Sequence, residues 1–342
     1  MAPKIFATGT TGYVGGDVLF LLLQAHPHWA SSIKCLVRNQ KRGESLERAY
    51  PELTLVYGTL DDAAVLEREA ENAEIVLHFA SSDHTGAAEA IARGLKRREE
   101  GGKSAHWIHT SGTDVLLLQS GEEHSGNKVF DDWDGVEECT GRPDSSPHRL
   151  IDKIVLSTAS SAITTAIVCP SLIYGKGRGP GNQRSIQAYE LCRLILERGK
   201  GFTFGHEDYM WFHIHIQDLA RLYTSLVLAA IANDNDQELW KGKGYYLAEN
   251  GEHRWNDVAV SITKEAHQRG FIKSDTTEVM GSEKHGELMQ AMGPAIWNVK
   301  SRAKALRAGK VAGWKPRERG LMDEVPEIVS GEAQRAGLVS SK

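Results

Sequence analysis

The sequence has few cysteines, no long hydrophobic run and no glycosylation sequon. The 342 residues include four cysteines, none of them in a C-x-x-C pair, so no disulfide framework is expected. Apolar stretches such as Val18 to Leu23 fall far below the roughly 18 residues that a membrane span requires. The chain enters a strand-like run at its first residues, so we expect no cleavable leader and a cytoplasmic protein with reduced thiols.

Basic residues do not outnumber acidic ones. The 40 Lys and Arg residues against 45 Asp and Glu residues give a formal net charge of -5, which offers no electrostatic footprint for nucleic acid. With 41% hydrophobic and 25% charged residues, the composition is that of an ordinary globular protein. His213 and His215 share one face of a predicted strand, but no third ligand accompanies them, so no metal site is predicted. The expected partner is a small-molecule substrate, without nucleic acid or membrane.

Over the first third of the chain, short apolar runs alternate with longer amphipathic stretches. The apolar runs predict strands at 5–7, 33–37, 53–56, 75–79 and 107–109, with helices between them. Runs that are apolar throughout belong to strands covered on both faces, as in a parallel sheet flanked by helices. The fold class is therefore predicted to be α/β, a Rossmann-type doubly wound parallel sheet.

Beyond residue 170 the alternation loosens into a glycine-rich loop and irregular stretches with scattered Trp residues. This change predicts two units. The first, residues 1–170 completed by about 212–235, is the predicted Rossmann domain. The second, residues 171–211 and 244–342, is a predicted smaller α/β lobe that binds substrate.

The strongest local signal lies directly after the first predicted strand, where the run TGTTGYVGG, residues 8–16, opens the first predicted helix. Gly9 permits a tight turn, Gly12 lets backbone amides approach a pyrophosphate, and Gly15 allows close packing of the helix. The anion then lies at the positive end of the helix. At the first strand–helix junction of such an array, the run predicts a dinucleotide site.

The G-x-x-G-x-x-G spacing resembles the extended and atypical branch of the short-chain dehydrogenase/reductase superfamily, whose members are NAD-dependent epimerase/dehydratase-like. Four further segments, in the order that the family shows, carry the same resemblance. They are IVLHFAS at 75–81, CPSLIYG at 169–175, HIHIQDLA at 213–220 and AGWKP at 312–316. The resemblance covers residues 8–316 and implies the family's fold, its nicotinamide cofactor and an oxidoreductase-type activity.

The resemblance also implies which residues contact the cofactor. They lie in the glycine turn, at the ends of the third and fourth predicted strands, on the catalytic helix and in the CPSLIYG segment. The set is Gly9, Thr11, Gly12, Tyr13, Val14, Gly15, Thr59, Leu60, Phe79, Ala80, Ser81, Lys153, Pro170 and Ile173.

The end of the second predicted strand indicates which nicotinamide cofactor is bound. NAD-selective sites place an Asp or Glu about 20 residues after the glycines, whereas NADP sites place a cation there. This strand ends in Val37, Arg38 and Asn39, without an acid, so Arg38 is predicted to clamp the 2′-phosphate of NADP(H). In the alternative, Arg38 stacks on the adenine of NAD(H).

The catalytic positions depart from the family pattern, which is a Ser or Thr after the fifth strand and a Y-x-x-x-K pair on the next helix. Residues i and i+4 share a helix face, so the lysine lowers the pKa of the phenol and holds the nicotinamide ribose. Here Ser111 matches the hydroxyl position and Lys153 matches the lysine, but Arg149 stands where the tyrosine is expected. Arginine stays protonated and cannot deliver that proton.

Three chemical solutions are open at the sequence level. His148, or another group such as Tyr174, supplies the proton; Arg149 acts as a fixed cation that stabilises a developing negative charge; or the site is redox-silent. A further alternative is that residues 148–153 only begin a surface helix and that the match is shifted along the chain.

These observations predict an NADP(H)-dependent oxidoreductase that acts on a carbonyl or alcohol of a small organic molecule. A second hypothesis keeps the cofactor but has no net redox change, as in an epimerase, isomerase or dehydratase. A third is a non-catalytic regulator that senses the dinucleotide. The resemblance also implies a homodimer.

Overall fold

The computed structural model describes residues 2–117, 128–205, 209–234, 236–280 and 300–339. Its centre is a sheet of seven strands in which every neighbouring pair is parallel. In sheet order the strands are β11 (Tyr245–Ala248), β7 (Ile163–Pro170), β5 (Ala105–Thr110), β4 (Ile75–His78), β1 (Ile5–Thr8), β2 (Ile33–Val37) and β3 (Thr54–Tyr57). The predicted Rossmann-type sheet is confirmed.

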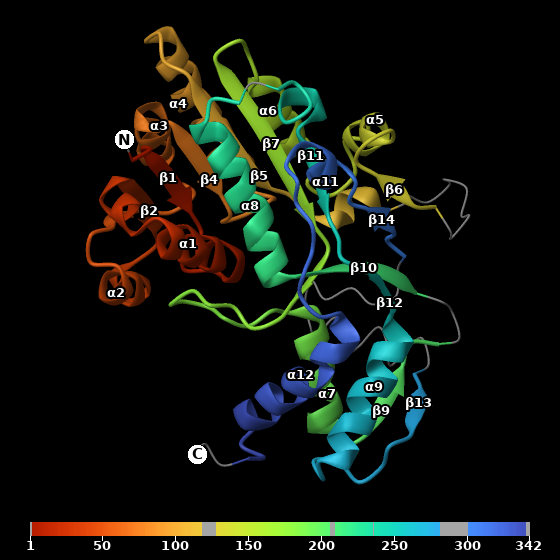
Figure 1. Ribbon diagram of the computed structural model, residues 1–342. Coiled ribbons are helices and arrows are strands. Elements are labelled where there is room, and N and C mark those ends of the chain that lie inside the picture. The colour runs from red at the N-terminus through yellow and green to blue at the C-terminus, as the bar shows by residue number, and fades with distance from the viewer. Residues whose placement is uncertain (1, 118–127, 206–208, 235, 281–299, 340–342) are drawn as a thin grey trace.

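Helices cover both faces of this sheet (Figure 1). On one face α1 (Tyr13–Ala25) packs against α8 (Ile216–Ile231). On the other face α4 (Thr85–Glu100) contacts both α3 (Ala63–Asn72) and α6 (Arg149–Thr158). Because both faces are covered, every residue of β1, β4, β7 and β11 is buried, whereas Thr54 and Tyr57 of the edge strand β3 are exposed.

Side chains of β1 show how the two faces are separated. Ile5 and Ala7 belong to the core beneath α1 and α8, whereas Phe6 belongs to the core beneath α3 and α4. This is the two-residue period of a strand that is buried on both sides. Parallel strands of this kind bring their carboxyl ends to one edge of the sheet, where ligands bind.

A smaller lobe lies beyond that edge (Figure 1). Its helices α7 (Gln187–Arg198), α9 (Trp255–Gln268) and α12 (Leu321–Arg335) pack on one another and on the strand pair β9 (Gly201–Thr203) and β13 (Thr277–Val279). A second small sheet, β12-β10-β8, joins the two units through β8 (Leu172–Tyr174), β10 (Met210–His215) and β12 (Glu252–Arg254). The buried Trp211 and Trp255 belong to the core of this lobe.

The remaining elements are short. They are η1 (Pro27–Ser32), α2 (Gln40–Ala49), η2 (Thr113–Leu116), β6 (Phe130–Asp131), α5 (Val136–Thr140), η3 (Lys241–Lys243), β14 (Ala303–Lys304) and α11 (Arg307–Val311). Among the described residues, no helix is long and apolar enough to cross a membrane.

The structure differs from the predicted division into domains at residues 245–248. The sequence analysis places this segment in the lobe, but as β11 it forms the edge of the main sheet, with Tyr245 paired to Ile167 of β7. All four of its residues are buried, which is what an apolar strand gains by joining a covered sheet. Trp314 likewise packs in the sheet core beside α8 rather than in the lobe. The chain therefore crosses between the units more often than predicted.

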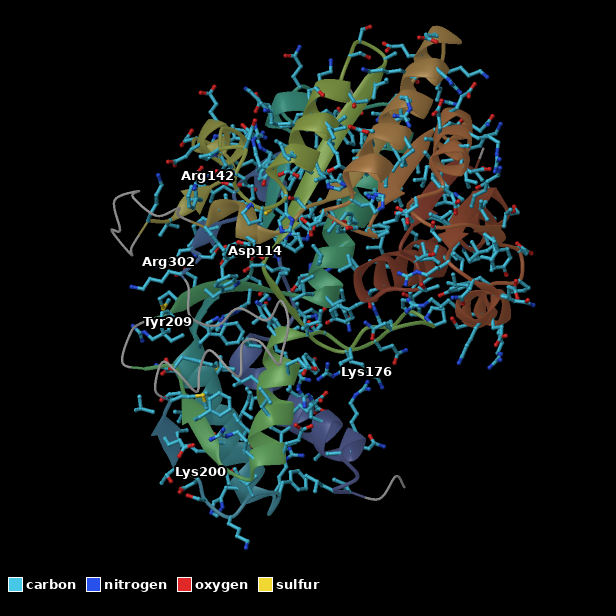
Figure 2. All side chains as sticks on the ribbon, turned by 180° about the vertical axis from the view of Figure 1, so that it is seen from behind. Asp114, Arg142, Lys176, Lys200, Tyr209 and Arg302 are labelled. Atoms are coloured by element: carbon cyan, nitrogen blue, oxygen red, sulfur yellow. The ribbon has the colours of Figure 1, made fainter. Side chains whose placement is uncertain are left out.

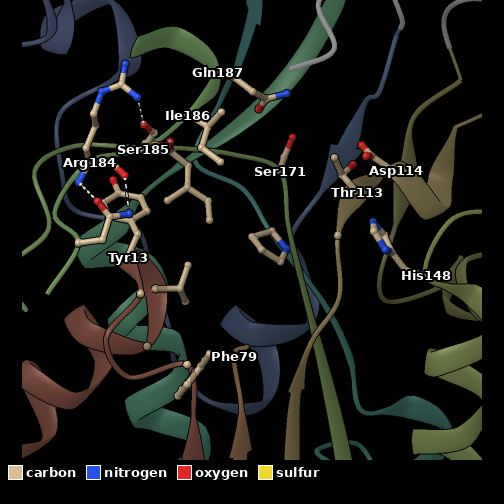
Figure 3. Close-up of a pocket in the computed structure, with 18 of the residues that line it drawn as sticks. Tyr13, Phe79, Thr113, Asp114, His148, Ser171, Arg184, Ser185, Ile186 and Gln187 are labelled. Carbon is tan, nitrogen blue, oxygen red and sulfur yellow. Dashed lines mark hydrogen bonds between the residues drawn. The ribbon is translucent and has the colours of Figure 1, made fainter. Parts of the chain in front are cut away.

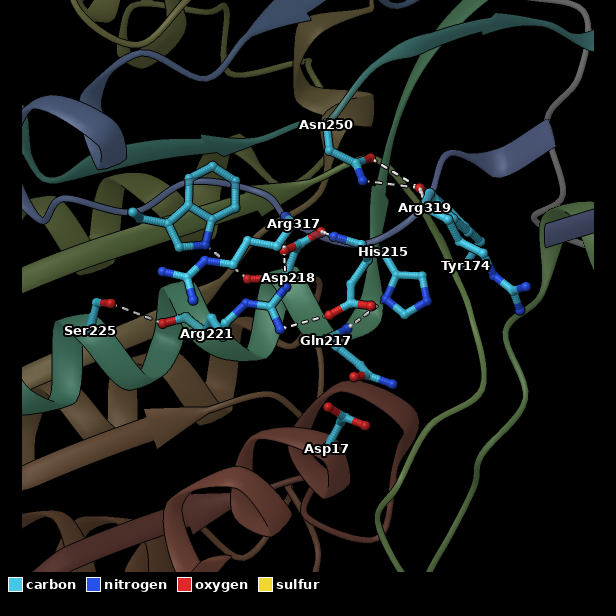
Figure 4. A network of polar contacts seen from close by, with 12 residues as sticks. Asp17, Tyr174, His215, Gln217, Asp218, Arg221, Ser225, Asn250, Arg317 and Arg319 are labelled. Carbon is cyan, nitrogen blue, oxygen red and sulfur yellow. Dashed lines mark hydrogen bonds and ion pairs between the residues drawn. The ribbon is translucent and has the colours of Figure 1, made fainter. Parts of the chain in front are cut away.

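Asp218 connects the chain that returns from the lobe to the first turn of α8 (Figure 4). Its buried carboxylate accepts hydrogen bonds from the backbone N–H groups of Arg317, at 2.7 Å, and Glu318, at 3.1 Å. The carbonyl oxygen of Asp218 accepts a third bond from Nε1 of Trp314, at 2.9 Å. The Asp218 carboxylate also pairs with Arg221. Asp218 of the HIHIQDLA segment thus fixes the returning chain to α8.

Asp132 joins distant segments of the chain in the same way. Its buried carboxylate accepts hydrogen bonds from the backbone N–H groups of Leu247, Leu306 and Arg307, at 2.7–2.9 Å. Burial is the largest influence on this carboxyl and raises its pKa to about 6. One side chain therefore joins β11 to the segment that leads into α11.

Candidate functional site

The glycine turn needs the conformations that the sequence analysis assigns to it. Gly9 has a φ of +76°, in the left-handed region, and a Cβ there would lie 2.8 Å from the backbone N and Cα of Ala80. A Cβ on Gly15 would lie 2.6 Å from the carbonyl oxygen of Gly9. The turn is therefore pressed against the end of β4 and against the first turn of α1, and only glycine fits at these positions.

The N-terminus of α1 is open to an anion. Gly12 is its N-cap and provides no capping side chain, and the first turn carries no acidic residue. The nearest carboxylate on the helix, Asp17, is buried and bound by Arg178, with distances of 2.6–3.2 Å. Backbone N–H groups at a helix start, without a competing acid, fit a phosphate.

A cavity of 170 Å³ extends from this turn toward the ends of β2 and β3. Arg38 and Arg42 lie on its wall, and none of its described lining residues is acidic. The cavity lining is Gly9, Thr11, Gly12, Leu36, Arg38, Arg42, Gly58, Thr59, Leu60, Phe79 and Ala80. Two guanidinium groups at this position match the charge of a ribose phosphate.

The acids closest in sequence to this cavity are already bound. The carboxylate of Asp62 accepts bonds from the backbone N–H of Thr59, at 2.6 Å, and from its hydroxyl, at 3.1 Å. Asp61 pairs with His84 at 3.1 Å. Neither carboxylate lines the cavity, so the lining offers no acidic partner for ribose hydroxyls.

A larger pocket of 440 Å³ continues from the same turn into the space between the sheet and the lobe. Figure 3 shows Phe79 at its base, Tyr13, Arg184 and Ser185 on one side, and Thr113, Asp114 and His148 on the other. The lining is Gly9, Gly12, Tyr13, Val14, Gly15, Phe79, Gly112, Thr113, Asp114, His148, Pro170, Ser171, Ile173, Asn182, Arg184, Ser185, Ile186, Gln187 and Trp211. Gly9, Gly12 and Phe79 line both cavities, which are therefore adjacent, and the two are called the groove below.

His148 is placed in this pocket by an unusual backbone. It is the N-cap of α6 and has a φ of 62°, in the left-handed region. A side chain in this region costs about 1–3 kcal/mol and is often found at functional sites. A Cβ on Gly112 would lie 2.8 Å from Nε2 of His148, so the missing side chain at position 112 makes room for the imidazole.

Asp83 holds the imidazole from the other side. Its Oδ1 lies 2.6 Å from Nδ1 of His148, and the backbone N–H of Asp83 donates to the hydroxyl of Ser81 at 3.1 Å. The His148 side chain is 12% exposed, against 67% for Asp83. A carboxylate on Nδ1 fixes the tautomer of the ring and leaves Nε2 for the pocket.

Ser111 lies behind the pocket wall rather than in it. Its buried hydroxyl donates to Oδ2 of Asp152 at 3.1 Å, and the hydroxyl of Tyr245 donates to the same oxygen at 3.3 Å. Burial is the largest influence on Asp152 and raises its pKa to about 7. The Ser111 hydroxyl thus supports the N-terminal turn of α6, and Thr113 lies in the pocket.

Lys153 and Arg149 do not occupy the positions that the sequence analysis predicts. Nζ of Lys153 binds the carboxylate of Asp144 at 2.8 Å on the outside of the molecule. Neither Lys153 nor Arg149 lines the pocket. Nε of Arg149 donates to the carbonyl of Arg142 at 3.0 Å. Because α6 begins at Arg149, the residues of its inner face are one position earlier than expected. His148 takes the place predicted for position 149, and Asp152 that predicted for position 153.

The other predicted cofactor residues fall into two groups. Thr11, Arg38, Thr59, Leu60 and Ala80 line the smaller cavity. Tyr13, Val14, Gly15, Pro170 and Ile173 line the larger one. Ser81 lines neither and orients Asp83 instead.

Sequence reasoning missed Asp83, Asp114, Trp211 and Gln187. A signal existed for Asp83, since it lies in the polar run SSDH that directly follows the fourth strand. No local pattern marks Trp211 and Gln187, because they reach the pocket from β10 and α7 of the lobe.

The comparisons with known proteins agree with this fold. Residues 5–240 match the model of the NAD dependent epimerase/dehydratase family. The chain is 35% identical to Oxidase ucsJ of Acremonium sp, an alignment that covers 99% of this chain and 100% of the relative. These two matches establish the family at the level of sequence.

Solved structures share the fold at low identity. Yeast methylglyoxal/isovaleraldehyde reductase Gre2, complexed with NADPH, aligns with a TM-score of 0.61 and 14% identity over 98% of this chain and 99% of that one. A dTDP-glucose 4,6-dehydratase from Bacillus anthracis, in complex with NAD, aligns with a TM-score of 0.66 and 14% identity over 98% of each chain. With its parallel sheet, its glycine turn and its groove at the carboxyl ends of the strands, the chain belongs to the NAD dependent epimerase/dehydratase family.

Proposed function

We propose that the protein is an NADP(H)-dependent oxidoreductase that acts on a carbonyl or alcohol of a small organic molecule. One observation carries the proposal. At one end of the groove the described lining contains Arg38 and Arg42 and no acidic residue, and at the other end lies His148, which is hydrogen-bonded to Asp83. The sequence relative named as an oxidase and the structural neighbour named as a reductase support an oxidoreductase.

The residues of the groove fit the cofactor. The start of α1 would hold the pyrophosphate, and Arg38 with Arg42 would hold the 2′-phosphate of NADP(H). Thr59, Leu60 and Ala80 would surround the adenine. When bound, the cofactor supplies or accepts the hydride.

His148 is proposed to move the proton. In the direction of carbonyl reduction, Nε2 donates a proton to the substrate oxygen as the carbon atom receives the hydride. Asp83, hydrogen-bonded at Nδ1, keeps the ring in place and directs Nε2 toward the pocket. In the direction of alcohol oxidation, the same Nε2 accepts the hydroxyl proton. A histidine thus does what the family's tyrosine does, from the same end of the same helix.

The hydroxyl of Thr113 is proposed to orient the substrate oxygen. It lines the pocket beside His148 and lies 2.8 Å from the hydroxyl of Ser301, which can receive its proton or donate one. This assignment replaces Ser111, whose hydroxyl is directed to Asp152.

A second candidate, a dinucleotide-sensing protein without catalysis, is favoured by the outward position of Lys153. An enzyme without net redox change remains the family's other activity, as the dehydratase among the structural neighbours illustrates. Both candidates predict cofactor binding, and they differ from the proposal in the fate of the hydride.

The test begins with calorimetric titration of NADPH and NADH, followed by a screen of small aldehydes, ketones and alcohols at the nicotinamide absorbance band. We expect NADPH to bind more tightly than NADH and His148→Asn to lower turnover by about 100- to 10,000-fold, with NADPH affinity unchanged. Asparagine tolerates the left-handed conformation at position 148.

The matched control is His84→Asn. His84 also pairs with an aspartate, and it caps α4, but it lines neither cavity. Equal losses in the two variants would refute the role of His148. Cofactor binding without hydride transfer to any substrate of the screen would favour the sensing protein.

A further inference from the structure

One carboxylate of the substrate pocket has no partner within the part of the chain that the structure describes. Asp114 lies on η2, directly after β5, and its side chain is half-buried in the pocket wall. No hydrogen bond or ion pair joins its carboxylate to a described residue. Burial, as the largest influence, raises its pKa; the nearby His148 opposes this shift, and Asp83 adds to it. A carboxylate left in this state gains stability from any cation that enters the pocket.

In the described lining of the same pocket, the side chains that can carry a positive charge are His148, which is held by Asp83, and Arg184. Arg184 is the only Lys or Arg among those residues. Its Nε and Nη2 bind the carboxylate of Glu332 at 2.7 and 2.9 Å, and its Nη1 binds Glu190 at 2.6 Å. Two carboxylates thus surround one guanidinium, so Arg184 cannot pair with a further anion without losing one of them.

The remaining wall is mostly apolar. Phe79, Ile173, Ile186 and Trp211 line the space between the cofactor turn and Asp114. Asp114 is placed where the sheet domain meets the lobe (Figure 2). A ligand that satisfies both features has a small hydrophobic or aromatic body and a positively charged group at one end.

We propose that Asp114 is a specificity-determining residue that selects substrates with a basic nitrogen, an ammonium or protonated ring amine, near the reacting carbonyl or alcohol. This inference rests on the proposed function, because it places the substrate between His148 and the lobe. The N–H of the protonated amine donates to the carboxylate of Asp114, and the apolar body packs on Phe79 and on the exposed Ile186 of the lining.

The same arrangement disfavours anionic substrates. The diphosphate of a nucleotide sugar, such as the UDP-glucose bound to an epimerase of similar fold from Thermotoga maritima, would meet the charge of Asp114 without a free Lys or Arg in the described lining. Like charges this close cost free energy, and a buried phosphate needs cationic partners.

The test uses the full chain saturated with NADPH and three probes of one shape: benzylamine, benzyl alcohol and benzoate. Dissociation constants are measured at pH 7 by ligand-observed NMR titration. We expect benzylamine, as its ammonium ion, to bind about tenfold more tightly than benzyl alcohol, as a charge-assisted hydrogen bond implies. Benzoate is expected to bind most weakly.

Asp114→Asn keeps the shape of the side chain and removes its charge. In this variant we expect benzylamine and benzyl alcohol to bind within about twofold of each other, with NADPH affinity unchanged as evidence of a correct fold. Asp144→Asn is the matched control, since Asp144 is an aspartate on the outer surface bound to Lys153, and it should keep the full preference for the amine.

Three results would overturn the inference: no preference for benzylamine in the wild type, a preference that persists in Asp114→Asn, or tightest binding of benzoate. These results are distinguishable from a failure of the proposed function. If NADPH does not bind or His148→Asn keeps full turnover, the oxidoreductase proposal fails. If both hold and the amine preference is absent, only the role of Asp114 fails.

Discussion

The two ends of the groove are built in different ways. The cofactor turn, residues 9–16, holds its ligand site with backbone: a left-handed glycine, a close contact to Ala80 and open N–H groups of α1. The proposed catalytic wall depends on the Asp83 and His148 side chains, which meet from separate segments, and on the space that Gly112 leaves for the imidazole. Backbone sites leave a pattern of glycines that is visible in the sequence, whereas a side-chain site can shift by one residue and lose its pattern.

The largest effect is expected at the cofactor turn. Gly9→Ala places a Cβ 2.8 Å from the backbone of Ala80 and forces alanine to a φ of +76°. Strain of about 1–3 kcal/mol, added to this clash, should weaken NADPH binding by about a hundredfold and lower the Tm. Calorimetric titration and thermal denaturation measure the two effects.

Gly102→Ala is its control. Gly102 has nearly the same φ, +72°, but a Cβ there would meet nothing within 4 Å, and it lies far from the groove. It should lower the Tm slightly and leave NADPH affinity intact. A similar loss of NADPH affinity in both variants would contradict the role of the turn as a backbone site.

The second-largest effect is expected at Arg38, at the outer end of the turn. Arg38→Ala should weaken NADPH binding by about 10- to 100-fold, because a guanidinium–phosphate contact is charge-assisted. NADH, which lacks the 2′-phosphate, should bind as in the wild type. Lys41→Ala is the matched control, since Lys41 lies on α2 near the cavity but not in its wall. An equal loss for both cofactors would assign Arg38 to the adenine instead.

A smaller effect tests the support of the catalytic wall. The pKa of Asp152 is raised from 3.8 to about 7, chiefly by burial. Between these values the folded protein holds a proton that the unfolded chain has lost, so the contribution of this group to stability falls as pH rises from about 4 to 7. Asp152→Asn removes that loss. The free energy of unfolding of the variant, minus that of the wild type, should therefore increase over this range and level off above pH 7.

This subtraction is needed because other groups titrate in the same range. Buried His78, His106 and His213 have pKa values lowered to about 4, mainly by burial, so their contributions to stability are lost as pH falls below 6.5. Asp144→Asn provides the control, since the pKa of that carboxyl is lowered, mainly by the hydrogen bond from Lys153. Its difference curve should be flat from pH 5 to 8. A flat curve for Asp152→Asn would contradict the assignment.

The smallest effect is expected at Lys153. Its ammonium group binds Asp144, and the two side chains are 47% and 61% exposed. Lys153→Ala should change turnover and NADPH affinity by less than about twofold, because exposed ion pairs contribute little. A loss of turnover as large as that of His148→Asn would show that Lys153 acts in the site, as the lysine of the family pattern does.

The sequence predicts the parts of the molecule that follow from short-range rules. The parallel sheet follows from apolar runs such as residues 33–37, and the phosphate turn follows from Gly9, Gly12 and Gly15. The register of α6 could not be predicted, because it depends on the left-handed backbone of His148 and on the space left by Gly112. Nor could the place of β11, since its partner β7 lies more than 70 residues earlier in the chain.

That last strand bears on how the protein is made. On a ribosome, β1 to β7 emerge within the first 170 residues, but the strand that covers the outer edge of β7 emerges only at residues 245–248. The backbone that Asp132 binds near Leu306 emerges later still. During this interval the nascent chain presents an unpaired edge, the kind of surface that pairs with other chains. Completion of the sheet therefore waits until α7 and β9 of the lobe have been synthesised.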